Sequence, residues 1–250
     1  MGADPLRIDF PGLDPPDPPD LRRGEGEQKR PRGASSVWAF SAGLLAWALG
    51  LCLFAALPFF ALIRTSVYLF DRYPVSGWTA LGGGVVATVV LLLLYLVAVS
   101  FRFGGKGRVP KSVRRGTALL VGSYCLFALI YLSSANAKTE EVRSTYTALA
   151  PILRVATSTL LLVDREGVLT DTGRTEEDYR TWGIPVNDAS LHLPQADGYV
   201  YAVDIRTLAR PEWRNRAVSF YFRLMGFETL RHVGTADHLH VSLDPSTQGS

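Results

Sequence analysis

All four histidines of the chain lie between residues 192 and 240, and two of them form the pair His238-Leu239-His240. Residues two apart in a strand project from the same face, so a strand here would aim both imidazoles in one direction. His192 and Asp204 lie a short way upstream. Imidazole nitrogens and a carboxylate together make a ligand set for Zn²⁺, and three protein ligands leave a fourth position open for water. The histidine-rich segment therefore predicts a metal site.

The cysteines do not belong to this site. Cys52 and Cys125 both lie in long apolar stretches, where a free thiol commonly serves as a packing residue. Structural zinc sites are usually closed by four side chains, often cysteines, whereas catalytic sites keep an open position. A zinc site built without cysteine therefore favours catalysis over a purely structural role.

The order of short motifs around these residues resembles a known superfamily. Ser190-x-His192 is followed by Ala202-Val203-Asp204 and then by Asp237-His238-Leu239-His240-Val241. This order is similar to that of the zinc peptidases that include D-alanyl-D-alanine carboxypeptidases, lysostaphin-type endopeptidases and the hedgehog signalling domain. The resemblance covers about residues 140–245. It implies a small α+β domain with an antiparallel sheet, a Zn²⁺ ion held by His192, Asp204 and His240, and hydrolysis of peptide bonds by zinc-activated water.

The resemblance also implies roles for neighbouring residues. Asp237 or His238 would act as the catalytic base, and the sequence leaves the choice between them open. Arg174, in a Thr-Gly-Arg-Thr turn, and Ser190 correspond to substrate-binding positions, and Arg180 is the alternative for Arg174 as the holder of a substrate carboxylate. His232 matches no motif position, and we expect it to be a solvated strand residue.

The spacing between the first two expected ligands departs from the superfamily. Eleven residues separate His192 from Asp204, where the family pattern has six. The segment Pro194–Tyr199 is interpreted as an insertion. Two hypotheses follow: an active peptidase whose longer loop still returns Asp204 to the metal, or a catalytically inactive metal-binding or ligand-sensing module.

Three uncharged, largely apolar stretches precede this part of the chain, at residues 33–63, 73–101 and 116–137. Each is long enough to cross a hydrocarbon core of about 30 Å as a helix. They predict a membrane domain over residues 37–137 with helices at about 37–63, 79–100 and 117–134. The spans carry no internal ionisable residue, which favours an anchor over an ion pathway. Pro58 predicts a kink, and Gly82–Gly84 a close contact between helices.

Basic residues on either side of the spans predict the orientation. Residues 1–36, rich in Pro, Gly, Asp and Arg, are typical of a disordered tail, and this tail ends in a basic segment. The loop between the second and third spans has six Lys or Arg and no acid. Positive charge near span ends marks the cytoplasmic side, so residues 138–250 are expected outside the cytoplasm of a multi-pass plasma-membrane protein. No basic stripe with interleaved aromatics supports nucleic-acid binding.

Local patterns predict the elements of residues 138–250. We expect an amphipathic helix from Glu140 to Thr159 bent at Pro151, then strands at Leu160–Asp164 and Tyr199–Ile205. Pro211 is typical of a helix start and Gly226 of a helix end, so a helix over about 211–225 follows. Strands at Thr229–Val233 and His238–Leu243 read as a hairpin around Gly234-Thr235.

These observations combine into one expectation. The chain would be a membrane-anchored zinc metallopeptidase whose partners are the lipid bilayer and a peptide or peptidoglycan substrate. The substrate class comes only from the resemblance, and the topology would place the domain where a cell wall lies.

Overall fold

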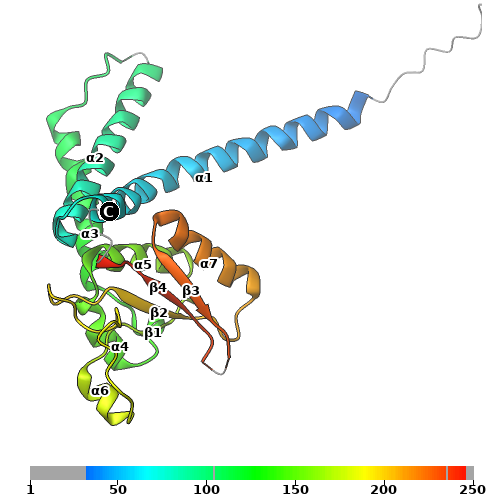
Figure 1. The fold of residues 1–250 in the computed structure, drawn as a ribbon. Coiled ribbons are helices and arrows are strands. Elements are labelled where there is room, and N and C mark those ends of the chain that lie inside the picture. Colours follow the sequence, from blue (N-terminus) through cyan, green and yellow to red (C-terminus); the bar gives the residue numbers. More distant parts are fainter. Residues whose placement is uncertain (1–31, 104, 235, 246–250) are drawn as a thin grey trace, which may run out of the picture. The chain divides into compact units, whose positions relative to one another are not determined.

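The computed structural model describes residues 32–103, 105–234 and 236–245, with side chains from Phe40 onward. Residues 1–31 of the expected tail lie outside the described residues. The chain divides into two compact units, 1–50 and 51–250. Within the first unit the described residues form only the N-terminal part of helix α1 (Arg32–Arg72), which therefore begins before the expected start of the first span. All other elements belong to the second unit. Figure 1 labels the helices and strands.

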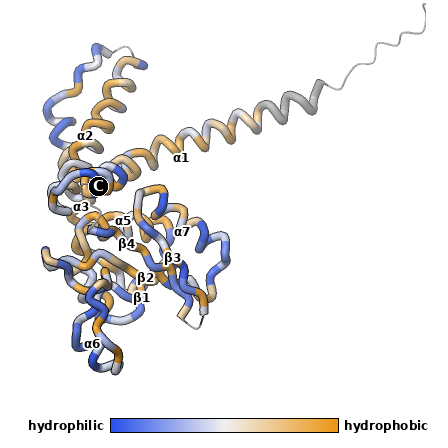
Figure 2. Tube along the Cα trace, viewed as in Figure 1, coloured by the Kyte–Doolittle hydropathy of each residue, from blue (hydrophilic) through white to orange (hydrophobic). Residues whose placement is uncertain are grey.

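Three helices are long and apolar enough to cross a membrane, as the sequence predicts. The spans are Phe40–Arg72 of α1, Gly77–Arg102 (α2) and Lys111–Ile130 (α3). Figure 2 shows apolar residues running along α1 and α2. Most of the large apolar side chains that are exposed in the described residues lie on these helices. A soluble monomer rarely exposes so much contiguous apolar surface, which indicates that the chain associates with a membrane.

Helices α1 and α2 pack closely at the expected glycines. A Cβ at Gly84 would overlap Ser66 Oγ and the Leu62 carbonyl oxygen of α1, and one at Gly83 would overlap Leu69. Gly82 has nothing within 4 Å of the same position. Small residues allow helix backbones to approach in this way. The predicted close contact is confirmed for two of the three glycines.

Pro58 has a specific consequence for the same helix pair. Proline has no backbone N–H, so the carbonyl four residues earlier lacks its helical donor. That carbonyl belongs to Phe54, and Tyr95 of α2 donates its hydroxyl to it over 3.3 Å. The two rings stack with centroids 3.8 Å apart. A side chain of α2 thus satisfies the carbonyl that Pro58 leaves open in α1.

After α3 the chain forms a small antiparallel α+β domain. Its elements in order are the 3₁₀ turn Ser134–Asn136, α4 (Glu140–Ser144), the 3₁₀ turn Thr145–Ala148, α5 (Pro151–Val163), β1 (Leu169–Asp171), α6 (Glu176–Thr181), β2 (Ala202–Arg206), α7 (Glu212–Met225), β3 (Glu228–His232) and β4 (His238–Ser242). The strands form one sheet in the order β1-β2-β4-β3, with every pairing antiparallel. Figure 1 shows β3 at one edge of this sheet.

The two faces of the sheet differ sharply. Val203 and Ile205 of β2, with Leu239 and Val241 of β4, are almost fully buried in a core that also contains Phe222 of α7. Helix α7 packs on β3 and β4 at this face. The alternate residues of β2 and β4 include Asp204 and His240, which project from the opposite face. Helices therefore cover one face, and the polar residues lie on the other.

Several sequence predictions are confirmed here and others are wrong. The helix that starts after Pro211 and ends at Gly226 is present, with Gly226 in the left-handed conformation at φ 103°. The hairpin β3–β4 is also present. The expected strand at Leu160–Asp164 is instead the last turn of α5 and its cap, because a short apolar run does not distinguish a buried strand from a buried helix.

The long helix expected over residues 140–159 is also wrong. Pro151 does not bend that helix but begins α5, since a proline is best tolerated in the first turn. Every residue from Pro151 to Leu161 is buried, so α5 is a core helix and not an amphipathic surface helix. Strand β1 and helix α6 were not predicted.

The sheet domain is joined directly to the ends of the membrane helices. The Tyr201 ring, just before β2, stacks on Phe70 near the end of α1 with centroids 5.7 Å apart. Trp78 Nε1, at the start of α2, donates to Tyr199 Oη over 2.8 Å. Tyr146 donates its hydroxyl to the Ala128 carbonyl of α3 over 2.9 Å. One continuous apolar core therefore runs from the helices into the domain.

Candidate metal centre

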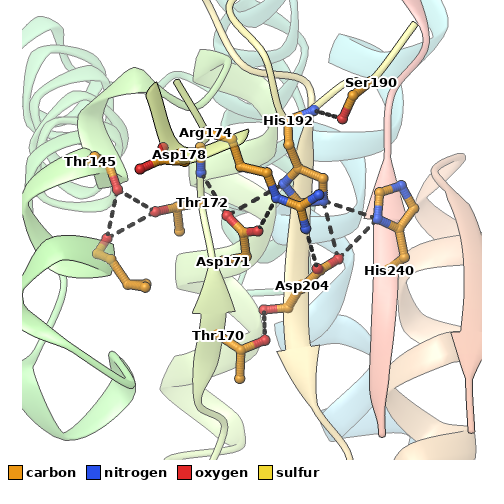
Figure 3. Close-up of polar contacts among 12 residues, drawn as sticks. Thr145, Thr170, Asp171, Thr172, Arg174, Asp178, Ser190, His192, Asp204 and His240 are labelled. Atoms are coloured by element: carbon orange, nitrogen blue, oxygen red, sulfur yellow. Dashed lines mark hydrogen bonds and ion pairs between the residues drawn. The ribbon is translucent and has the colours of Figure 1, made fainter. Parts of the chain in front are cut away.

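His192, Asp204 and His240 lie together as the sequence predicts (Figure 3). His240 Nδ1 is 2.9 Å from Asp204 Oδ1, and His192 Nε2 is 3.3 Å from that oxygen. The two ring nitrogens are 3.2 Å apart. These three side chains could hold a metal ion, and they are the group with this property among the described residues.

The triangle of ligand atoms has the size that a tetrahedral ion requires. Bonds of about 2.0–2.1 Å to nitrogen and oxygen place neighbouring ligand atoms about 3.3 Å apart in a tetrahedron. The three sides here are 2.9, 3.2 and 3.3 Å. The donor set and its spacing therefore fit a small divalent cation, with a fourth position left for another ligand.

Strand pairing fixes two of the three groups. Asp204 and His240 are direct partners in the β2–β4 ladder. Opposite residues of an antiparallel pair have Cβ atoms about 4.5–5.5 Å apart, which suits a shared ion. Both side chains project from the face that α7 leaves uncovered. The eleven-residue gap after His192 does not prevent this arrangement, because Asp204 belongs to a central strand whose register sets its position.

His192 comes from the loop before β2 and is held by its neighbours. Its N–H faces Ser190 Oγ at 3.4 Å, and its carbonyl accepts a hydrogen bond from the Arg174 N–H at 2.8 Å. Tyr201 N–H donates to the Leu191 carbonyl over 2.9 Å. Ser190, expected to bind substrate, thus makes a contact within the loop that carries His192.

The segment Pro194–Tyr199, interpreted as an insertion, is a folded loop. Gln195 donates from its side chain to the Ser190 and Leu193 carbonyls, and its backbone N–H donates to the Tyr199 carbonyl. Asp197 accepts the Tyr201 hydroxyl over 2.6 Å. The loop ends at Tyr199, which accepts the hydrogen bond from Trp78. The segment Pro194–Tyr199 therefore connects the loop that carries His192 to helix α2.

Arg174 does not stand free as a carboxylate clamp. Its Nε donates to Asp171 Oδ2 over 2.6 Å, and its terminal nitrogen lies 3.8 Å from Asp204 Oδ2. The guanidinium also lies over the ring of Trp182 at 5.7 Å from the centroid. Arg174 is next to the triad, but its charge is already paired with two carboxylates.

Asp171 lies beside the triad and was not predicted as a site residue. Its Oδ1 lies 3.6 Å from His192 Nδ1, the ring nitrogen that faces away from the triad. That nitrogen is buried and has no hydrogen-bond partner among the described residues. A ligand histidine commonly directs its second N–H to a carboxylate, which fixes the ring. The one signal in the sequence is an aspartate three residues before Arg174.

The two expected bases have different surroundings. His238 Nε2 lies 3.6 Å from Asp204 Oδ2, and its Nδ1 lies 2.6 Å from the Ala236 carbonyl, so Nδ1 carries the proton. Asp237 points elsewhere: Arg231 donates to both of its oxygens and Thr207 to one. These contacts lower the pKa of Asp237 to about 2. Of the two, the structure brings His238 to the triad.

The remaining polar residues lie outside the triad. The exposed His232 ring stacks on His238 with centroids 4.8 Å apart. Arg180, the alternative to Arg174, pairs with Glu176 and Glu177 on the exposed side of α6.

Asp204 is an ionised carboxylate. Burial alone would raise the pKa of its carboxyl, but hydrogen bonds from His192 and His240 and the nearby His238 hold that pKa well below its usual range. The buried Asp204 carboxylate therefore brings a negative charge to the triad. Such a site is suited to a cation.

Comparison with family models, with curated proteins and with solved structures finds no match for this chain. The fold and the site define a coarser class: three candidate membrane helices joined to a small antiparallel α+β domain with a histidine–aspartate–histidine group that could hold a metal ion.

Proposed function

We propose that the protein is a membrane-anchored zinc peptidase that acts outside the cytoplasm, on peptides of the cell wall. The observation that carries the proposal is the triangle formed by His192 Nε2, Asp204 Oδ1 and His240 Nδ1. Its sides match tetrahedral coordination, and its three ligands leave one position open. The same residues carry the resemblance to D-alanyl-D-alanine carboxypeptidases and lysostaphin-type endopeptidases.

Zinc suits this ligand set better than the harder cations do. Mg²⁺ and Ca²⁺ take oxygen ligands almost throughout, whereas two imidazoles and a carboxylate suit zinc. A zinc ion here would lower the pKa of a bound water to about 7 and polarise a substrate carbonyl.

His238 is the residue that would receive a proton. Its Nδ1–H is directed to the Ala236 carbonyl, so Nε2, which lies toward the carboxylate end of the triad, is the ring nitrogen that would take the proton. A general base must lie within hydrogen-bond reach of its proton, directly or through one water. The His238 side chain is one-quarter exposed, so substrate can approach it. Asp237 would hold the hairpin through Arg231 and Thr207.

Arg174 and Ser190 would act mainly by positioning. Arg174 holds Asp171 and approaches Asp204, and its backbone N–H fixes the His192 loop. A substrate carboxylate would have to compete with Asp171 for the guanidinium. The wall-peptide substrate rests on the resemblance and on the orientation that the basic loops predict.

A second candidate function is a metal-binding or ligand-sensing module without turnover. It is favoured by the pairing of Arg174 with Asp171, because the cation expected to hold a substrate carboxylate is already neutralised.

The test uses the full chain in lipid nanodiscs, loaded with Zn²⁺. Metal content is measured by mass spectrometry, and cleavage is followed with a D-Ala-D-Ala-ended muropeptide and a cross-linked dimer. We expect one zinc per chain, cleavage of one substrate, and loss of at least 100-fold in rate in His238→Ala with the zinc retained. Asp188→Ala, on an exposed loop, is the control and should keep both. Stoichiometric zinc with no cleavage would support the module, and absence of zinc would refute both the peptidase and a metal-binding module.

A further inference from the structure

We propose that helix α7 of the sheet domain lies in the membrane interface beside the last turns of α1, with one face in contact with lipid. The domain would then touch the bilayer itself and not only through the three spans. The inference rests on an exposed apolar face, on the depth of the contacts that α7 makes, and on the position of its arginines.

The exposed face of α7 is an apolar stripe. Its members are three or four residues apart in the sequence, the spacing that places side chains in one row along a helix: Trp213, Ala217, Phe220 and Leu224. Trp213 is 70% exposed, Phe220 66% and Leu224 47%. The opposite side of the helix holds the buried Val218, Phe222 and Met225. The helix is therefore apolar on two faces, and the domain covers only one of them.

Contacts on one flank of the stripe reach the apolar spans. Tyr221 donates its hydroxyl to the Ala156 carbonyl of α5 over 2.8 Å. One turn further along α5, the hydroxyl groups of Thr159 and Tyr124 are 2.5 Å apart, and the Tyr124 ring meets Phe59 edge-on with centroids 5.3 Å apart. Tyr124 lies six residues before the end of α3, about 9 Å along the helix axis. Helix α7 is thus separated from the apolar part of α3 by α5 alone.

The C-terminal end of α7 also meets a membrane helix. Gly226, which ends α7, lies against Arg64 and Val67 of α1, where a Cβ would overlap both side chains. Gly226, Arg64 and Val67 all belong to the second unit, residues 51–250. The end of α7 is therefore held at the level of the last turns of α1.

The two exposed arginines of α7 lie along one flank of the apolar stripe. Arg214, near the N-terminal end of α7, lies on the Tyr221 flank and pairs with Asp164 and Glu166. On a helical projection at 100° per residue, the apolar stripe lies between Tyr221, on the side of the spans, and the row of Arg216 and Arg223, on the side away from them. Both arginines are exposed. Arginine can keep its charge in water while its stem covers apolar surface, and aromatic residues favour the membrane interface. This pattern is typical of a helix that lies along a bilayer surface.

A second exposed leucine provides a control within the same domain. Leu230 of β3 is 58% exposed, close to the value for Leu224. It is the ladder partner of His240, so its side chain belongs to the face of the sheet that carries the metal site. If α7 lies on lipid, Leu230 faces water.

The experiment places nitroxide labels on the full chain in nanodiscs of phosphatidylglycerol and phosphatidylcholine. In a background with Cys52→Ser and Cys125→Ala, the labels are attached at Phe220→Cys, Leu224→Cys and, as control, Leu230→Cys. We expect oxygen to relax the labels at 220 and 224 more than a water-soluble nickel complex does, and the reverse at 230. A water-like profile at 220 and 224 would refute the proposal.

A second measurement needs no label. The fluorescence of Trp213 is obtained as the difference between the wild-type protein and Trp213→Phe. Brominated lipids should quench it, and a lack of quenching would count against the proposal. Labels at 220 and 224 that are shielded from both relaxants, with a short distance between labels on two chains, would instead show that a second copy covers this face. Zinc binding does not enter either readout, so the outcome is independent of the proposed function.

Discussion

Asp204 and His240 face each other across the β2–β4 ladder with Oδ1 and Nδ1 2.9 Å apart. Backbone pairing places the two residues opposite each other, since both project from the same face of the central strands. An ion bound here would therefore cross-link the middle of the sheet.

Zinc should consequently stabilise the folded protein. A ligand that binds only the native state adds about 2.7 kcal/mol at 100 times its dissociation constant. We expect the unfolding temperature of the full chain in detergent to rise with added Zn²⁺ and to fall when a chelator removes it. His240→Ala should abolish the response and His232→Ala should retain it. An equal response in His240→Ala would place the metal elsewhere.

Asp171→Asn should weaken metal binding although Asp171 is not a ligand in the triangle. It removes the carboxylate that faces His192 Nδ1 and the partner of Arg174. Loss of such a partner typically costs 10–100-fold in metal affinity. Competition with a chromogenic chelator measures this loss, and Asp188→Asn, on an exposed loop, is the control. A purely structural role would instead lower the unfolding temperature of the metal-free protein and leave the affinity unchanged.

Gly84→Ala should disturb the packing of α2 against α1. The new methyl would overlap a backbone carbonyl, which cannot move without shifting the helix. Overpacking of this kind costs about 1–3 kcal/mol. Gly82→Ala is the matched control, because the same methyl meets nothing within 4 Å. Unfolding in mixed micelles of increasing sodium dodecyl sulfate compares the two, and equal midpoints would contradict the proposed close contact.

The domain should not fold when it is cut from its helices. A fragment of residues 138–250 loses the Ala128 carbonyl that accepts the Tyr146 hydroxyl and the Leu129 carbonyl that accepts Arg154 Nη1. It also exposes the apolar side of α5 that packs on α2 and α3. We expect the isolated fragment to aggregate or to bind a hydrophobic dye strongly. A monomeric fragment with a cooperative unfolding transition would show that the core is not shared.

Asp237→Asn should change how stability depends on pH. Contacts with Arg231 and Thr207 lower the folded-state pKa of Asp237 from its model-compound value of 3.8 to about 2. The ionised carboxylate therefore stabilises the fold above pH 4, and this contribution is lost as the pH falls through about 2. The unfolding temperature of the variant should lie below that of the wild type at pH 6, and the gap should close between pH 4 and pH 2. Asp188→Asn should show no such gap.

The sequence predicted the parts of the site that depend on local periodicity. His238 and His240 lie on one strand because alternation places residues two apart together, and Gly226 ended its helix as expected. The same alternation could have separated Asp237 from His238, since adjacent residues of an extended segment project to opposite sides. Asp237 indeed turns toward Arg231 and Thr207.

The rest of the site depends on contacts between distant segments. Asp171 reaches His192 through an irregular β1–β2 pairing, in which the register shifts between Leu169 and Asp171. Nothing in the local sequence signals that shift. The helical state of Leu160–Val163 likewise follows from its continuity with the core helix α5, which packs on α3 and α7, whereas the apolar run alone fits a strand equally well.

The direct contacts between Tyr201 and Phe70 and between Tyr199 and Trp78 leave the domain without a flexible stalk. Asp204 is three residues from Tyr201 along β2, roughly 10 Å at the rise of a strand. A site held in this way stays at a short, fixed distance from the ends of the membrane helices. It would meet only material that comes within a few nanometres of the bilayer, and encounters would depend on lateral diffusion of the whole protein in the plane of the membrane.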